Sequence, residues 1–173
     1  GPLSRGRHCF YDELMYAQRK EFCDAISLFC QSELHRRWFL EDIPRLVTAP
    51  LQHGKMKIFY SELGVPEGLF SHLFFDDKDQ VGFLEGSRRI QPEDWAKGPG
   101  EGTLWVVDMI APFNNGSKIA RRVQKDLSDL YYDTYDKDGA WMRRPAKGGH
   151  PRWVPGVLSK VEKRKKERLS HVA

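Results

Sequence analysis

Asp108 is the only charged side chain in a strongly apolar stretch, residues 104–110. The neighbouring residues are strand formers, and such a run predicts a buried strand that is covered on both faces. A carboxylate buried there costs several kcal/mol unless a cation or a hydrogen-bond donor faces it. Two interpretations stay open: Asp108 is a structural residue bonded to backbone amides, or it holds a partner for acid–base chemistry.

His35 is the second candidate, in a segment that reads Ser-Glu-Leu-His-Arg-Arg-Trp over residues 32–38. An imidazole exchanges protons near neutral pH, which suits a general acid or base. A single histidine between two helical pieces is, however, more often a surface or core residue. Cys30 precedes it, but without a nucleophile-elbow signature a thiol–histidine pair is only weakly indicated.

The strand that contains Asp108 leads into a turn and then into a predicted helix, for which Ser117 is the expected N-cap. Backbone amides at the N-terminus of a helix bind anionic or carbonyl oxygens. The candidate contacts for such a group are Asn114, Asn115, Gly116 and Ser117.

Other elements must position these residues. Apolar residues at helical spacing predict an amphipathic helix over residues 11–29 and a short helix over residues 39–46. Residues 57–60 and 68–75 predict an antiparallel hairpin. His72, in the second strand of the hairpin, is expected to be packed rather than to act as an acid or base.

Asp76, Asp77 and Asp79 are predicted to form an exposed turn, because this segment lacks the glycine and the final glutamate of a calcium loop. Trp153 and Val154 predict a last edge strand. Helices and strands mixed in this order favour an α/β fold, an α+β sandwich.

The 173 residues suit a single domain. We expect this domain over residues 1–156, with a tag remnant at residues 1–3, and a basic tail or helix over residues 157–173. No stretch has the length of a membrane span. Three cysteines without paired spacing argue against a disulfide framework and against a metal site, which favours a reducing cytoplasm.

The net charge of +4 is concentrated at the C-terminal end. From Arg152 onward, seven Lys or Arg residues face two Glu, so this end carries +5 and the rest of the chain carries −1. Such a run is usually solvated surface, but it also suits an acidic partner. Trp141 and Trp153 among arginines keep open an alternative function, a non-catalytic module that binds nucleic acid or an acidic protein.

Three segments resemble one family. Residues 32–38 resemble the Ser-Pro-x-His-Arg-x-Trp motif of the RTX toxin-activating lysine acyltransferases, the hemolysin-activating proteins of Gram-negative bacteria. Residues 104–113, Leu-Trp-Val-Val-Asp-Met-Ile-Ala-Pro-Phe, are similar to that family's Trp-x-x-Asp-x-Ile-Ala-Pro-Phe core. Residues 93–95, Glu-Asp-Trp, match the family upstream of that core.

The resemblance implies a GNAT-like acyltransferase fold, with a mixed central sheet flanked by helices. It implies transfer of a fatty acyl group from acyl-acyl carrier protein to internal lysines of an RTX protoxin in the bacterial cytoplasm, without a bound cofactor or metal. The family's catalytic histidine and aspartate fall on His35 and Asp108, and Ser32 matches a supporting serine. Relatives form dimers, so a homodimer is also expected, whereas nucleic acid is not an expected partner.

Two departures from the family pattern affect the loops. Glu33 replaces the usual proline, and Asn114 and Asn115 replace the usual Gly-Asp pair. The resemblance therefore does not fix the geometry of these loops or the acyl-chain preference.

The chemistry agrees with this resemblance. A lysine ammonium, with a pKa of about 10.4, is not a nucleophile, so acyl transfer from a thioester needs a base that removes a proton as attack occurs. We predict that His35 accepts this proton, that Asp108 orients the imidazole, and that amides of residues 114–117 stabilise the oxyanion.

Donor recognition is predicted at other residues. The acidic carrier protein is predicted to contact Arg121, Arg122 and the tail. The acyl chain is predicted to lie in an apolar groove beside the central strand, and coenzyme A thioesters are predicted to be poor donors.

Overall fold

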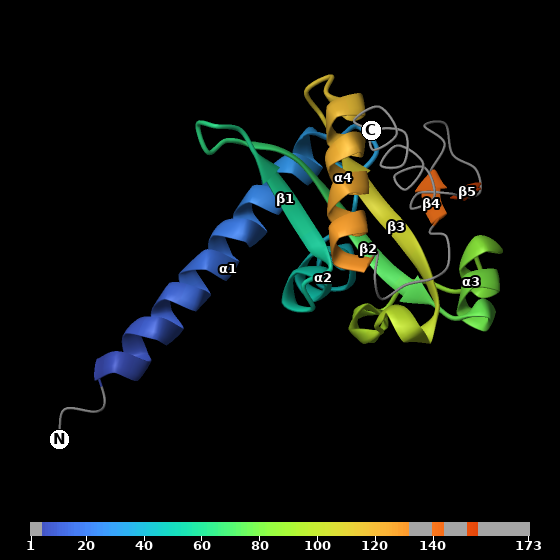
Figure 1. The fold of residues 1–173 in the computed structure, drawn as a ribbon, viewed down its shortest axis with the longest axis horizontal. Helices are drawn as coiled ribbons and strands as arrows, with labels where there is room; N and C mark the ends of the chain where they lie inside the picture. Colours follow the sequence, from blue (N-terminus) through green and yellow to red (C-terminus); the bar gives the residue numbers. More distant parts are fainter. Residues whose placement is uncertain (1–4, 132–139, 144–151, 156–173) are drawn as a thin grey trace, which may run out of the picture.

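The computed structural model describes the backbone of residues 5–131, 140–143 and 152–155, and the side chains of residues 18–131. Figure 1 shows the arrangement of its helices and strands. In chain order the elements are α1 (Arg5–Gln31), the π-helical turn η1 (Pro44–Thr48), α2 (Ala49–Gln52), β1 (Met56–Tyr60), β2 (Pro66–Phe75), α3 (Asp77–Leu84), the 3₁₀ turns η2 (Pro92–Ala96) and η3 (Pro99–Glu101), β3 (Thr103–Ile110), α4 (Gly116–Tyr131), β4 (Ala140–Arg143) and β5 (Arg152–Pro155).

The strands form one mixed sheet in the order β1-β2-β3-β4-β5. β1, β2 and β3 are antiparallel neighbours, β3 and β4 are parallel, and β5 is antiparallel to β4. The parallel pair requires a crossover connection, and α4 lies in that connection. The predicted hairpin, the central position of the Asp108 strand and the last edge strand are confirmed.

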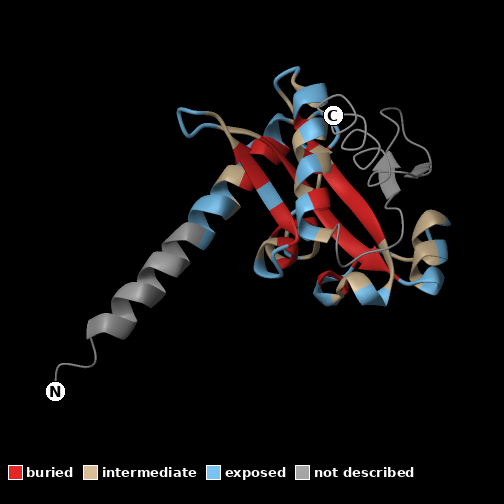
Figure 2. Cartoon of the chain, in the orientation of Figure 1, coloured by how far each residue is buried: buried red, intermediate tan, exposed pale blue. Residues whose placement is uncertain are grey.

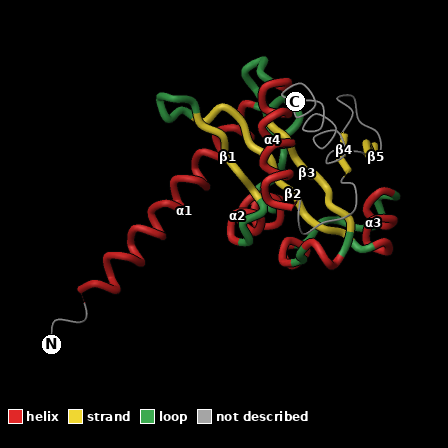
Figure 3. Tube along the Cα trace, viewed as in Figure 1, coloured by secondary structure: helices red, strands yellow, loops and turns green. Residues whose placement is uncertain are grey.

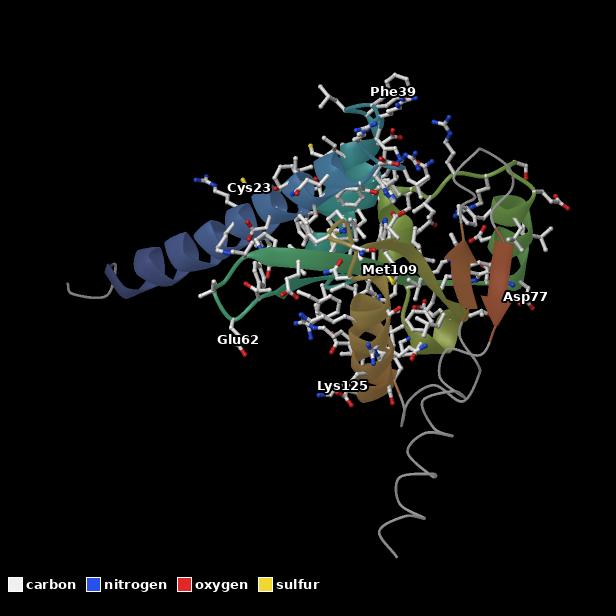
Figure 4. All side chains as sticks on the ribbon, turned by 90° about the horizontal axis from the view of Figure 1, so that it is seen from above. Cys23, Phe39, Glu62, Asp77, Met109 and Lys125 are labelled. Carbon is white, nitrogen blue, oxygen red and sulfur yellow. The ribbon has the colours of Figure 1, made fainter. Side chains whose placement is uncertain are left out.

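The sheet separates two helical layers (Figure 3). On one face α4 packs through Ile119, Val123 and Leu127 onto aromatic residues of β1 and β2. The opposite face is covered by the C-terminal turns of α1 and by η1, α2, α3 and η2. Phe39 and Lys125 mark these two sides of the sheet in Figure 4. An α/β sandwich with a mixed sheet is thereby confirmed.

Burial follows the strands. β2 and β3 are buried over most of their length (Figure 2), as the near-continuous apolar runs predict for strands covered on both faces. Because both faces are dry, any polar side chain on these strands requires a specific partner. Ser71, His72 and Asp108 are such residues.

Residues 76–79 form no exposed turn, and that prediction is wrong. Asp76 is the N-cap of α3, and its carboxylate accepts a hydrogen bond from the backbone amide of Asp79 at 2.8 Å. Asp77 and Asp79 lie in the first helical turn, where carboxylates interact favourably with the helix dipole. The aspartate cluster is therefore a helix start signal.

Two other helix boundaries differ from the prediction. α4 begins at Gly116, and the backbone amide of Ile119 donates to the carbonyl of Asn115 at 3.0 Å, so Ser117 lies inside the first turn instead of capping it. The short helix predicted over residues 39–46 begins later, at Pro44, because proline is favourable at the first helical position.

The tail at residues 157–173 and the side chains of Trp141 and Trp153 lie outside the described residues. The division into a domain and a tail, and the alternative function as a basic binding module, stay predictions. Among the residues that the structure describes, no helix has the length and apolar character needed to cross a membrane.

Candidate active site

His35 lies in a tight turn directly after α1. The backbone amides of His35 and Arg36 both donate to the carbonyl of Ser32, at 3.1 and 2.9 Å, which reverses the chain at the end of the helix. The imidazole packs edge-on between the rings of Phe29 and Trp38, with ring centroids 5.4 and 4.8 Å away. Only 6% of His35 is exposed, so the turn and the two aromatic rings fix the imidazole.

Asp108 reaches the same face of the sheet because of a β-bulge. Ser71 pairs with Asp108 while His72 pairs with Val106, so Val107 is an extra residue on β3. Val107 packs in the same cluster as Trp105, and Ile110 packs against α1 on that same face. Strict alternation from Val107 would direct Asp108 toward α4; the bulge directs it toward His35 instead.

Ser71 supports the bulged strand. Its hydroxyl accepts a hydrogen bond from the backbone amide of Asp108 at 3.3 Å, and its side chain is fully buried. Ser71 did not emerge as a site residue from the sequence. A serine within the apolar run of residues 69–75 is the signal that could have identified it, by the same reasoning that singled out Asp108.

The side chains of His35 and Asp108, the two candidates from the sequence, are in contact. His35 Nε2 lies 3.1 Å from Asp108 Oδ1, and Ser32 Oγ lies 2.6 Å from His35 Nδ1. Asp108 is 2% exposed. Because a carboxylate only accepts, Nε2 carries the proton toward Asp108, and in the neutral ring Nδ1 is then the basic nitrogen that accepts from the Ser32 hydroxyl. The geometry is that of an imidazole held by a carboxylate, an arrangement that orients a base in other histidine-dependent sites.

The turn between β3 and α4 contains the other predicted contacts. Asn114 has a positive φ of 57°, a conformation that asparagine tolerates better than most residues. The Asn115 side-chain amide donates to the Glu67 carbonyl at 3.1 Å, which ties the turn to the start of β2. Among the described contacts, none joins residues 114–117 to His35, and their proposed role as oxyanion donors stays a prediction.

Arg121 and Arg122 lie on α4, which covers the face opposite His35. Arg122 pairs with Glu67 at 3.2 Å and lies 4.4 Å above the ring of Phe59. Arg121 is exposed, and its Nε donates to the Ser117 carbonyl. The structure therefore does not bring these arginines to the His35–Asp108 pair.

Cys30 is exposed at the end of α1, and the structure records no hydrogen bond between its thiol and His35. The weak thiol–histidine interpretation thus gains no support. Among the residues that the structure describes, no group of three or more His, Cys, Asp or Glu side chains is arranged to hold a metal ion.

His72 is packed, as expected. Its Nε2 lies 2.6 Å from the Tyr131 hydroxyl, and its ring stacks on Phe70. Burial, with a smaller contribution from the positive charge of Lys55, lowers the pKa of His72 to about 3. The ring therefore stays neutral near neutral pH and cannot serve as a base that cycles through a charged form.

The lowered pKa of His72 makes the folded protein less stable in acid. Its pKa is 6.5 without the protein environment, so between pH 6.5 and 3 the unfolded chain binds a proton that the folded chain does not. Stability is therefore lost as the pH falls, by about 2 kcal/mol between pH 7 and pH 5. Urea unfolding at these two pH values should show a smaller loss for His72→Gln than for the wild type. Equal losses in both proteins would contradict this assignment.

The model of the RTX toxin acyltransferase family matches residues 16–142 of the chain. This match includes His35, Asp108, and both helical layers around the sheet. No curated protein matches the chain.

Proposed function

Because the chain belongs to the RTX toxin acyltransferase family, we propose that it transfers a fatty acyl group from acyl-acyl carrier protein to lysine side chains of an RTX protoxin. The observation that carries this proposal is the buried contact between His35 and Asp108. Acyl transfer to an amine needs a proton acceptor, and this pair provides one.

The reaction starts with a substrate lysine that is protonated in water, and this ammonium first releases one proton to the solvent. Its neutral amine attacks the thioester carbonyl carbon, a tetrahedral oxyanion forms, and the carbon–sulfur bond then breaks. The amine loses one proton to His35 as the new carbon–nitrogen bond forms, and that proton then passes to the departing thiolate. The products are an amide and a free thiol, so no oxidant or reductant is required.

Nδ1 is the atom of His35 that accepts this proton. The other ring nitrogen donates to Asp108, so the two roles are separated in space. Ser32 lies at Nδ1, where the proton must arrive, and its hydroxyl either relays the proton or is displaced by the incoming amine. This supporting role for Ser32 follows from its position three residues before His35 in one turn.

Asp108 contributes orientation and charge. It fixes which ring nitrogen is basic, and its negative charge stabilises the imidazolium that forms during attack. The electrostatic attraction between Asp108 and a protonated His35 is stronger here than at the protein surface, because both side chains are shielded from water. The aromatic rings of Phe29 and Trp38 contribute to this shielding.

The wider proposal follows the resemblance in the sequence. The fold is GNAT-like, the donor thioester is carried on the phosphopantetheine arm of acyl carrier protein, and no cofactor is resident in the enzyme. The protein acts in the bacterial cytoplasm, with a homodimer as the expected assembly. The mixed sheet and the family match support this proposal.

The test is direct detection of product. Purified protein is incubated with acyl-acyl carrier protein and a lysine-containing protoxin fragment, and the fragment is analysed by mass spectrometry. We expect an added acyl group on lysine, with much less product when the acyl-coenzyme A thioester replaces the carrier. An unmodified fragment would contradict the proposed function, and equal turnover with both donors would contradict the proposed donor.

A further inference from the structure

A cavity of about 260 Å³ opens beside Trp38, on the same side of the sheet as His35. Its apolar wall is formed by Trp38, Leu46, Phe83 and Ile90. The Trp38 ring is shared, because it lines the cavity and also lies 4.8 Å from the His35 ring. The cavity and the candidate active site are therefore neighbours, with the Trp38 side chain between them.

The cavity carries excess positive charge. Arg45, Arg88 and Arg89 line it, against one carboxylate, Asp42. Asp42 is already engaged, since Oδ1 accepts from Arg45 at 2.6 Å and Oδ2 accepts from the backbone amide of Phe39 at 3.0 Å. The acidic side chain at the cavity is thus neutralised by existing contacts.

The three arginines differ in how much hydrogen-bonding capacity they retain. Arg88 is held by Asp94 and Asp79, both at 3.0 Å, so it is a fixed part of the wall. Arg45 is anchored to Asp42 but keeps further N–H groups. Arg89 is exposed and has no carboxylate partner among the side chains that the structure describes. Arg89 and Arg45 are the groups available to an anion.

We propose that this cavity receives the phosphopantetheine arm of the acyl donor, with Arg89 and Arg45 binding its phosphate. The inference rests on the proposed function, since it assumes a donor of that chemistry. The arm combines one phosphodiester with a compact dimethyl group and ends in the thioester. A guanidinium rim suits the phosphate, and the wall formed by Trp38 and Phe83 suits the methyl groups.

The position of the cavity also agrees with the direction of transfer. In this proposal the arm, with its phosphate at Arg89, passes Trp38, which lines the cavity and contacts His35, before its thioester reaches His35. The arginines expected from the sequence to bind the carrier, Arg121 and Arg122, lie on α4 across the sheet. We therefore assign the phosphate contact to Arg89 and Arg45.

The test compares two forms of acyl carrier protein, one with the arm attached (holo) and one without it (apo). Binding to the purified enzyme is measured by titration calorimetry. Wild-type enzyme should bind the holo form more tightly than the apo form. Arg89→Gln and Arg89→Glu should weaken holo binding by about tenfold or more, the scale of one charged hydrogen bond to phosphate, and should leave apo binding nearly unchanged.

Lys125→Gln and Lys125→Glu are the matched controls. Lys125 is an exposed cation on α4, on the far side of the sheet in Figure 4. Neither control should change the difference between holo and apo binding. Circular dichroism verifies that all variants are folded.

The outcomes separate the two levels of the proposal. If wild-type enzyme transfers the acyl group but Arg89→Glu binds both carrier forms as the wild type does, the cavity assignment is wrong and the proposed function stands. If wild-type enzyme binds holo and apo carrier equally, the arm contributes no contact and the assignment is also wrong. If the wild type neither binds carrier nor transfers the acyl group, the proposed function itself fails.

Discussion

His35→Ala is expected to lower acyl transfer by about 10²-fold or more, the usual scale for loss of a positioned general base. The substitution removes Nδ1, the predicted proton acceptor, and leaves Asp108 buried without its imidazole partner. Transfer to a lysine substrate, followed under conditions where product forms linearly with time, measures the loss. The reduction should appear in kcat, because the missing group acts in the transition state.

His53→Ala is the matched control for this variant. His53 follows α2 and is exposed, so its removal should leave transfer unchanged. Urea unfolding shows how much stability each variant has lost. A folded His35→Ala protein that transfers the acyl group nearly as fast as the wild type would remove His35 from the mechanism.

Asp108→Asn should lower transfer by about 10²-fold or more while the protein stays folded. The side chains have nearly the same shape, but the amide lacks the negative charge that stabilises the imidazolium. It also allows the wrong ring nitrogen to carry the proton, because an amide can donate as well as accept. The rate of transfer and the unfolding transition of the same preparation are the two measurements.

Asp126→Asn provides a comparison on the other side of the sheet. Asp126 pairs with Lys57 at 2.6 Å and belongs to α4, so this variant should lose some stability but little activity. If Asp108→Asn merely unfolds, Asp108 is a structural residue, the other interpretation that its sequence context allowed. If Asp108→Asn is folded and fully active, its charge has no part in the reaction.

His35 and Asp108 could be singled out from the sequence because each is chemically unusual in its surroundings. An aspartate in an apolar strand requires a partner, and the family motifs surround both residues. Their contact could not be derived, because they are 73 residues apart and the link depends on a bulge in β3. A bulge is a one-residue change in pairing, and nothing in the run of residues 104–110 marks it.

The helical layers were predictable only in part. The amphipathic spacing of Ile119, Val123 and Leu127 identified α4, but not which face of the sheet it covers. That choice decides whether Arg121 and Arg122 can approach His35, and it is set by tertiary packing. The aspartates at the start of α3 do not distinguish a turn from a helix N-terminus in the sequence, because the same residues favour both.

The cavity beside Trp38 could not be predicted from the sequence. Its walls come from two segments, residues 38–46 and 83–90, which meet only in the fold. The contacts of Arg45 with Asp42 and of Arg88 with Asp94 likewise come from the folded structure. Pockets assembled in this way depend on contacts that are distant in sequence.

The pH dependence of acyl transfer tests the central claim, that His35 is the general base. In the wild type, kcat/KM should fall on the acidic side as the free enzyme's base becomes protonated. Titration of the substrate lysine also lowers the rate toward acid, but it does so equally in every variant. In folded His35→Ala, the remaining slow transfer should lose the additional fall caused by the enzyme's base and keep only the fall caused by the lysine. A pH profile of the same shape in folded His35→Ala and in the wild type would show that another group accepts the proton, and it would contradict the account.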